Sequence, residues 1–173
     1  MIDKLLQRRS IRKYTSQPIP EEKLRIILKA GLLSPTSKNL HPWEFLVIQD
    51  PDKLDNLADC REQGAGMLKG AAAAIIVMAD TSVNDVWVED CSIAMSNMHL
   101  TAADQGVGSC WIQVRNRMSK EEGKDTEAFI RELFAIGETY AVEAILSLGM
   151  SAQVRSPLVL DESLWEKIHY EAF

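Results

Sequence analysis

The stretch WVEDCSIAMSNMHLTAADQG, residues 87–106, is rich in small residues and methionine around most of a helical circumference. This pattern predicts a long helix from Val86 to Gln105 that is buried on several sides. Apolar runs typical of strands lie before and after it, at Ala73–Met78 and Ser109–Val114. A helix buried on several sides in a chain of 173 residues suggests that it also lies at a subunit interface.

Helices and strands alternate along the rest of the chain. Apolar periodicity and turn residues predict helices at Ile2–Arg9, Glu21–Leu33, Pro51–Cys60, Gln63–Lys69, Thr126–Ile136 and Ser163–Ile168, strands at Trp43–Ile48 and Ala141–Leu148, and an extended segment at Ser10–Tyr14. No repeat, linker or low-complexity segment interrupts this order. The sequence therefore predicts an α+β protein, a layered α/β sandwich with about four strands in a single domain, residues 1–173. The order of the strands in the sheet stays open.

The net charge of the chain limits the kinds of binding partner that can be expected. The chain has 19 Lys and Arg against 25 Asp and Glu, a formal net charge of -6 and an isoelectric point near 5.1. A broad surface that follows phosphates is therefore not expected, and neither nucleic acid nor an anionic membrane is predicted as a general partner. A local anion site remains compatible with this balance.

The cysteines and apolar runs indicate the compartment. Cys60, Cys91 and Cys110 lie far apart without CxxC spacing, and their odd number fits a reducing compartment better than a disulfide framework. No metal site is expected from them. The N-terminus lacks the apolar core of a secretory signal, and the longest apolar run, Ala71–Ala79, is too short to span a bilayer. We expect a soluble, cytoplasmic protein.

The segment Arg8–Tyr14, RRSIRKY, places four cations and a serine hydroxyl within seven positions of an acidic chain. Guanidinium groups bind phosphate oxygens in pairs, and serine adds a neutral donor. The segment therefore fits an anion site. A solvated basic helix end whose cations bind the last carbonyl groups explains the same residues.

A second polar segment, Ser34–Trp43, has the sequence SPTSKNLHPW. Most of its side chains can donate or accept hydrogen bonds next to the end of a helix, which suits a flat heteroaromatic ligand. Ser, Pro, Thr and Asn are also the usual residues of turns and helix caps. Composition alone favours the turn.

The two segments together resemble the signature of the FMN-dependent nitroreductases. RRSIRKY (8–14) followed by SPTSKNLHPWEF (34–45) is similar to an RxS-type segment and then a P-S-x-x-N-x-Q-P-W segment. MSNMHLTAADQGVGSCWI (95–112) resembles the long central helix and glycine turn of the family, and EKIHYEAF (166–173) its common ending. The resemblance implies a central, mainly antiparallel sheet of four to five strands, flanked by helices and completed by a partner subunit.

The resemblance assigns the basic segment to the cofactor. It implies that Arg8, Ser10 and Arg12 bind the FMN phosphate and ribityl chain, with Arg9 next to them. The family often supplies a further basic residue from the C-terminal tail. Arg155 is the cation that this sequence offers there, ahead of an apolar and then acidic stretch.

The second segment is implied to complete a neighbouring site. Pro35, Thr36 and Ser37 would approach the flavin of the partner subunit, and Asn39 would brace their loop. Thr36 stands where serine is usual in the family and His41 where glutamine is usual. Both substitutions keep the capacity to form hydrogen bonds.

The remaining site residues are implied for the flavin ring. Gln113 and the backbone of Val114 would lie near the redox-active nitrogen, and Gln63 or Lys69 would reach the pyrimidine side. His99, on the long helix, is expected to be a hydrogen-bonded core or interface histidine.

The implied activity is that of an NAD(P)H-dependent flavin oxidoreductase. NADH or NADPH would transfer hydride to the flavin and leave, and a small acceptor of the nitroaromatic, quinone or enone type would then bind in a ping-pong cycle. Because the flavin performs the chemistry, no catalytic acid, base or nucleophile is required. The implied assembly is a homodimer with FMN at the subunit interface. Two alternatives remain: a flavin-binding carrier or sensor without turnover, and another flavin reaction such as that of the family's dehalogenases or flavin-fragmenting enzymes.

Overall fold

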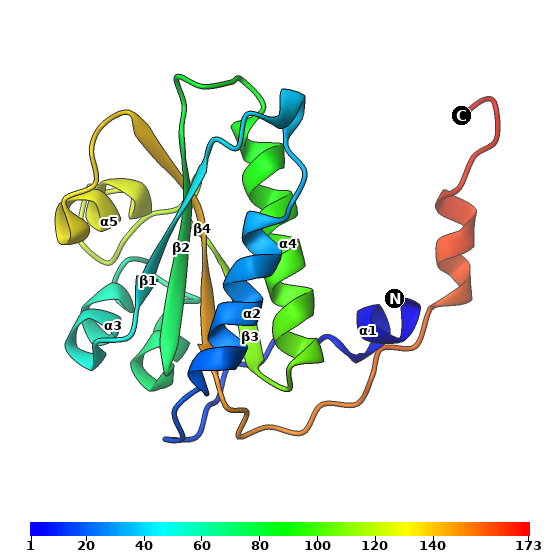
Figure 1. The fold of residues 1–173 in the computed structure, drawn as a ribbon, viewed down its shortest axis with the longest axis horizontal. Coiled ribbons are helices and arrows are strands. Elements are labelled where there is room, and N and C mark those ends of the chain that lie inside the picture. The colour runs from blue at the N-terminus through cyan, green and yellow to red at the C-terminus, as the bar shows by residue number, and fades with distance from the viewer.

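A computed structural model describes all 173 residues. Its elements are the helices α1 (Ile2–Gln7), α2 (Glu21–Leu32), α3 (Pro51–Leu57), α4 (Trp87–Asp104) and α5 (Thr126–Phe134), the strands β1 (Trp43–Ile48), β2 (Ala73–Asp80), β3 (Gly108–Gln113) and β4 (Tyr140–Gly149), and the short 3-10 helices η1 (Ser37–Asn39), η2 (Gly66–Gly70) and η3 (Glu162–Lys167) (Figure 1). None of these helices has both the length and the apolar character needed to cross a bilayer.

The four strands form one sheet in the order β1-β2-β4-β3, and every neighbouring pair is antiparallel. This arrangement confirms the expected α+β class and the mainly antiparallel sheet. The strand order could not be read from the sequence because β2 and β4 are central but separated by α4, β3 and α5 along the chain. The register of β2 against β4 shifts between Val77 and Met78.

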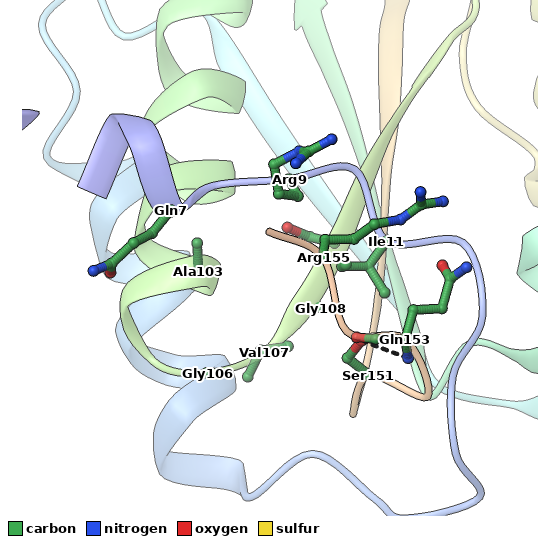
Figure 2. A pocket seen from close by; sticks show the side chains of 11 residues that line it. Gln7, Arg9, Ile11, Ala103, Gly106, Val107, Gly108, Ser151, Gln153 and Arg155 are labelled. Atoms are coloured by element: carbon green, nitrogen blue, oxygen red, sulfur yellow. Dashed lines mark hydrogen bonds between the residues drawn. The ribbon is translucent and has the colours of Figure 1, made fainter. Parts of the chain in front are cut away.

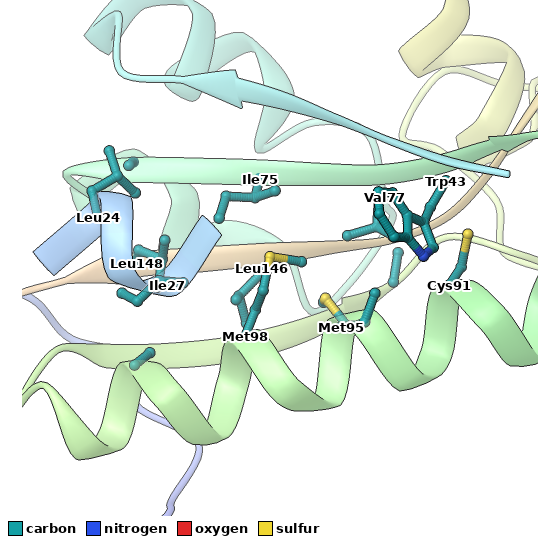
Figure 3. Packing of buried hydrophobic residues seen from close by; sticks show 14 of the residues in the cluster. Leu24, Ile27, Trp43, Ile75, Val77, Cys91, Met95, Met98, Leu146 and Leu148 are labelled. Atoms are coloured by element: carbon teal, nitrogen blue, oxygen red, sulfur yellow. The ribbon is translucent and has the colours of Figure 1, made fainter. Parts of the chain in front are cut away.

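The two faces of the sheet bury two apolar layers. α4 and α2 cover one face, where Met95 and Met98 pack against Ile75 and Leu146 (Figure 3). On the other face, α3, η2 and α5 cover a second cluster, to which β2 contributes Ile76. Ile75 and Ile76 point to opposite faces because side chains alternate along a strand. The result is a helix–sheet–helix sandwich.

Within one chain, α4 is buried on a single broad face. Met95, Met98 and His99 are buried, whereas Ile93 is 40% exposed and Ser96 is exposed. The prediction of burial on several sides is therefore not met by the chain alone. The sequence pattern shows how apolar the helix is but not which neighbours cover it.

Some predicted boundaries differ from the structure. The helix predicted at Gln63–Lys69 is wrong: Gln63 lies in a bend, and only Gly66–Gly70 forms a 3-10 helix. Gly64 has a φ of 90°, which interrupts regular helix at that point. α3 ends at Leu57, before the predicted Cys60, and α1 ends at Gln7 because Arg8 is already extended.

The chain after β4 leaves the sandwich. It runs past α1 and carries η3 away from the sheet, so that the C-terminus lies far from the core (Figure 1). All but one of the side chains from Ser151 to Phe173 are exposed. The tail therefore contributes almost nothing to the core of its own chain.

Candidate functional site

A cavity of about 260 Å³ collects most of the basic residues singled out in the sequence. Its lining consists of Arg8, Arg9, Ser10, Arg12, Arg155 and Leu158. We call it the arginine cavity. The tail residue Arg155 joins the N-terminal segment here, although the two lie at opposite ends of the chain.

Backbone pairing holds the N-terminal segment against the sheet. Ser10 bridges Ser109 at the start of β3, and the Ile11 N–H donates to the Ser109 carbonyl at 2.9 Å. The Ile11 side chain is buried, whereas Arg12 is exposed. Because side chains alternate in extended backbone, anchoring Ile11 turns Ser10 and Arg12 outward, where the cavity lies.

The segment ends at Tyr14, which packs directly on Gly149. The Tyr14 hydroxyl lies 2.8 Å from the Ile11 carbonyl oxygen and 2.7 Å from Ser147 Oγ. A Cβ atom at Gly149 would lie 2.7 Å from two carbons of the Tyr14 ring. Glycine is required here because the ring leaves no room for a side chain.

Gly149→Ala should therefore displace Tyr14 and loosen the N-terminal segment. We expect a loss of about 1–3 kcal/mol in the free energy of unfolding, as is usual for overpacking, and a melting temperature lower by roughly 3–10 °C. Thermal denaturation followed by circular dichroism measures the change. Gly137→Ala is the control, because a Cβ there meets nothing within 4 Å. Equal melting temperatures for both variants would contradict the assigned role of Gly149.

A smaller cavity of about 180 Å³ adjoins the arginine cavity. Figure 2 shows Arg9 on the segment after α1 and Arg155 on the tail, with the turn at Gly106 lower in the view; these residues help to line it. α4 ends here at Asp104, and the C-terminal end of a helix dipole repels anions. An anion at this place must therefore be held by the arginine side chains.

One arginine of the cavity is held by a buried histidine of α4. Arg8 Nη1 lies 3.0 Å from His99 Nε2, and His99 Nδ1 lies 2.7 Å from Ser109 Oγ. His99 is only 6% exposed. Burial, assisted by the positive charge of Arg8, lowers the His99 pKa to about 4. The ring is therefore neutral near pH 7, a hydrogen-bonded core histidine as expected.

The polar loop from Ser34 to Ser37 runs along α4 from Asn97 to Asp90. The Ser37 N–H donates to Asp90 Oδ1 at 2.9 Å, and Asn97 Nδ2 donates to Ser34 Oγ at 2.8 Å. Asp90 is buried and also accepts from Asn84 Nδ2 at 2.9 Å. The loop that contains Pro35 and Thr36 is thus fixed to the helix.

The turn after this loop relies on left-handed backbone. Lys38, Asn39 and His41 have φ values of 51°, 58° and 49°. Asn39 is exposed, and its backbone N–H donates to the Thr36 carbonyl at 3.1 Å, while Thr36 Oγ1 accepts from the His41 N–H at 3.0 Å. Asn39 therefore shapes the turn through its backbone, since asparagine tolerates this conformation.

The polar loop and the arginine cavity are spread along α4. Ser34, at the start of the loop, contacts Asn97, but Ser37 contacts Asp90, which lies roughly 13 Å along the helix axis, at 1.5 Å per residue, from the His99 that contacts Arg8. The residues that line the arginine cavity include none from the loop. A single chain therefore does not bring together the two segments that the sequence singled out.

The end of β3 contributes a third group of polar side chains. Gln113 is half-buried, and its Oε1 accepts from Trp111 Nε1 at 2.9 Å. The Val114 N–H donates to the Glu143 carbonyl at 3.3 Å. Gln63, in contrast, is exposed in the bend between α3 and η2, and it does not line the arginine cavity.

Two residues of this region were missed in the sequence. The Glu143 carboxylate is buried 3.7 Å from Arg115 Nε, and burial raises its pKa. A single charged residue within the otherwise apolar strand β4 was the sequence signal that could have identified Glu143. Ser109 lies near the start of β3, directly after the glycine turn, where serine is too ordinary a residue to be noticed.

The match to a family model agrees with this geometry. The model described as "Nitroreductase family" matches residues 5–66 and 61–150, which include the arginine segment, the polar loop, α4 and the sheet. The chain belongs to the nitroreductase family. The sequence resemblance is thereby confirmed, and it extends over most of the sandwich.

Individual nitroreductase relatives are similar over most of their length. An FMN-dependent nitroreductase from Clostridium difficile superposes with a TM-score of 0.95 at 46% identity, covering 100% of both chains. An Archaeoglobus fulgidus protein named "Putative NADH dehydrogenase/NAD(P)H nitroreductase" is 38% identical over 82% of this chain and 80% of its own. A Desulfovibrio desulfuricans protein solved in complex with FMN has a TM-score of 0.79 at 28% identity, covering 99% of this chain and 96% of its own.

Proposed function

We propose that this nitroreductase-family chain is an FMN-dependent oxidoreductase that takes hydride from NADH or NADPH and reduces a small nitroaromatic, quinone or enone acceptor. The observation that carries the proposal is the arginine cavity, because it gathers four guanidinium groups at one place in a chain of net charge -6. The names of the relatives, FMN-dependent nitroreductase and NAD(P)H nitroreductase, support the same cofactor and electron donor.

The donors of the arginine cavity fit a phosphate monoester. Arg8, Arg9, Arg12 and Arg155 supply planar N–H forks that match phosphate oxygens, and the Ser10 hydroxyl adds a neutral donor. The cavity contains no carboxylate that would compete for these donors. We assign these five residues to the FMN phosphate and its ribityl neighbour.

The polar groups at the end of β3 are assigned to the flavin ring. Trp111 occupies Gln113 Oε1, and the Gln113 amide also interacts with the Glu143 carboxyl group, so one of its two Nε2 hydrogens is left to donate to a ring acceptor. The Val114 N–H has only a long bond to the Glu143 carbonyl, so it can turn to a ligand at small cost. Bound FMN would supply the transfer of two electrons from NAD(P)H to the acceptor in two half-reactions. The chain would orient the ring and hold its charge.

We propose that the working unit is a homodimer. The polar loop with Pro35, Thr36 and Ser37 contributes no residue to the arginine cavity of its own chain, and Ser37 is held at Asp90, away from Arg8. We therefore assign the loop to the site of a partner, with Asn39 shaping its turn. Gln63 is kept as a candidate for the pyrimidine side. The exposed Ile93 face of α4 and the apolar tail are surfaces that a second copy would cover.

The three free, buried cysteines suit a reducing compartment such as the cytoplasm.

A visible absorption spectrum tests the activity. We expect the purified protein to be yellow and to bleach without oxygen when NADH or NADPH is added, and the colour to return when an acceptor of the right class follows. A colourless protein that gains no colour from added FMN would overturn the proposal. A yellow protein that neither nicotinamide bleaches would instead favour the carrier or sensor.

A further inference from the structure

We propose that His99 is a positioning residue whose neutral ring accepts a hydrogen bond from Arg8 and so aligns Arg8 for the FMN phosphate; this inference rests on the proposed function. His99 itself is outside the lining of the arginine cavity, whereas Arg8 belongs to it. The histidine would therefore act through Arg8 and not by contact with the cofactor.

The proton positions follow from the chemistry of the partners. A guanidinium can only donate hydrogen bonds, so the contact of 3.0 Å between Arg8 Nη1 and His99 Nε2 requires Nε2 to be the acceptor. In the neutral ring the proton then resides on Nδ1, which donates to Ser109 Oγ at 2.7 Å. Arg8 thereby selects this form of His99, and the Ser109 hydroxyl accepts from Nδ1 and holds the ring in place.

A neutral acceptor suits this task better than a carboxylate would. An aspartate or glutamate in the same place would hold Arg8 but would cancel the charge that attracts phosphate. Histidine occupies one of the five N–H groups of Arg8 and leaves the others, with the whole positive charge, for the cavity. Burial and the Arg8 charge both disfavour a charged ring, which keeps His99 an acceptor near pH 7.

The framework around His99 is rigid enough to direct Arg8. His99 projects from the middle of the C-terminal half of α4, and Ser109 belongs to β3. Arg8 follows directly after the short helix α1 and would otherwise be a mobile surface side chain. The contact thus ties the first arginine of the cavity to the core of the sandwich and lowers the entropy lost when phosphate binds.

Two substitutions by neutral residues separate the contact of His99 with Arg8 from its contact with Ser109. His99→Gln places an acceptor near the Nε2 position and keeps the partner of Arg8. His99→Asn places its amide near the Nδ1 position, so it can still reach Ser109 but not Arg8. The dissociation constants of FMN and of riboflavin, which lacks the phosphate, are measured for both variants and the wild type by quenching of flavin fluorescence.

We expect His99→Asn to weaken FMN by roughly tenfold and to leave riboflavin unchanged, while His99→Gln binds FMN nearly as the wild type does. Equal FMN affinity in the Asn variant and the wild type, or an equal loss for both flavins, would overturn the inference. Should His99→Asn fail to fold, Ser109→Ala takes its place, with an FMN-specific loss of a few fold expected and the same two overturning results. A wild-type protein that binds neither flavin would overturn the proposed function itself, a distinct outcome.

Discussion

Replacing Arg8 and Ser10 together by alanine should weaken FMN binding by roughly 30- to 1,000-fold, since a charge-assisted and a neutral hydrogen bond together contribute about 2–4 kcal/mol. Both residues line the arginine cavity, and Ser10 is held there by its bridge to Ser109. The double variant should purify with little or no yellow colour. Titration of the apoprotein with FMN measures the loss.

Lys13→Ala is the matched control for this experiment. Lys13 is an exposed cation of the same segment, but it does not line the arginine cavity. Its replacement lowers the net charge by the same amount as Arg8→Ala and should leave FMN affinity within about twofold, because distant exposed charges are screened by salt. Full retention of flavin by the double variant, or an equal loss in the Lys13 variant, would contradict the phosphate assignment.

Removal of residues 161–173 should convert a dimer into a monomer and, with it, empty the flavin site. This segment contains the exposed apolar side chains of Trp165, Ile168 and Phe173, which have no role in the core of their own chain. It excludes Arg155 and Leu158, so the arginine cavity keeps its lining. Light scattering during gel filtration should change from twice the full chain's 19.4 kDa to the mass of one truncated chain, and FMN should be lost because the partner's polar loop is no longer supplied.

Glu166→Gln provides the comparison for the truncated chain. It changes an exposed polar side chain of the same segment and should leave both the dimer and its flavin intact. A full-length chain that is already monomeric yet retains FMN would refute the proposal that the FMN site is built from two subunits. A truncated chain that stays dimeric would place the subunit contact on α4 alone.

The sequence predicted correctly those helices and strands that are specified by a few neighbouring residues. Trp43–Ile48 forms a strand with the predicted bounds, since aromatic and β-branched residues between polar turns suit a pleated surface in almost any context. α2 and α5 begin at the predicted residues because acidic first turns and caps mark helix starts. Gln63–Lys69 failed because composition suggested a helix, while Gly64 and Gly66 favoured a bend and a 3-10 turn.

The sequence by itself determined the class of fold, the basic character of Arg8–Arg12 and the family to which the chain belongs, because these depend on residue types at short spacing. The tertiary structure alone decided which groups meet. Arg9 donates to the Ser156 carbonyl across 147 positions, and Arg8 meets His99 across 91. Such contacts depend on how the N-terminal segment and the tail close over the end of the sheet, and no local periodicity encodes that closure. The buried charge of Glu143, the neutral acceptor on His99 and the separation of the polar loop from the arginine cavity all follow from that packing.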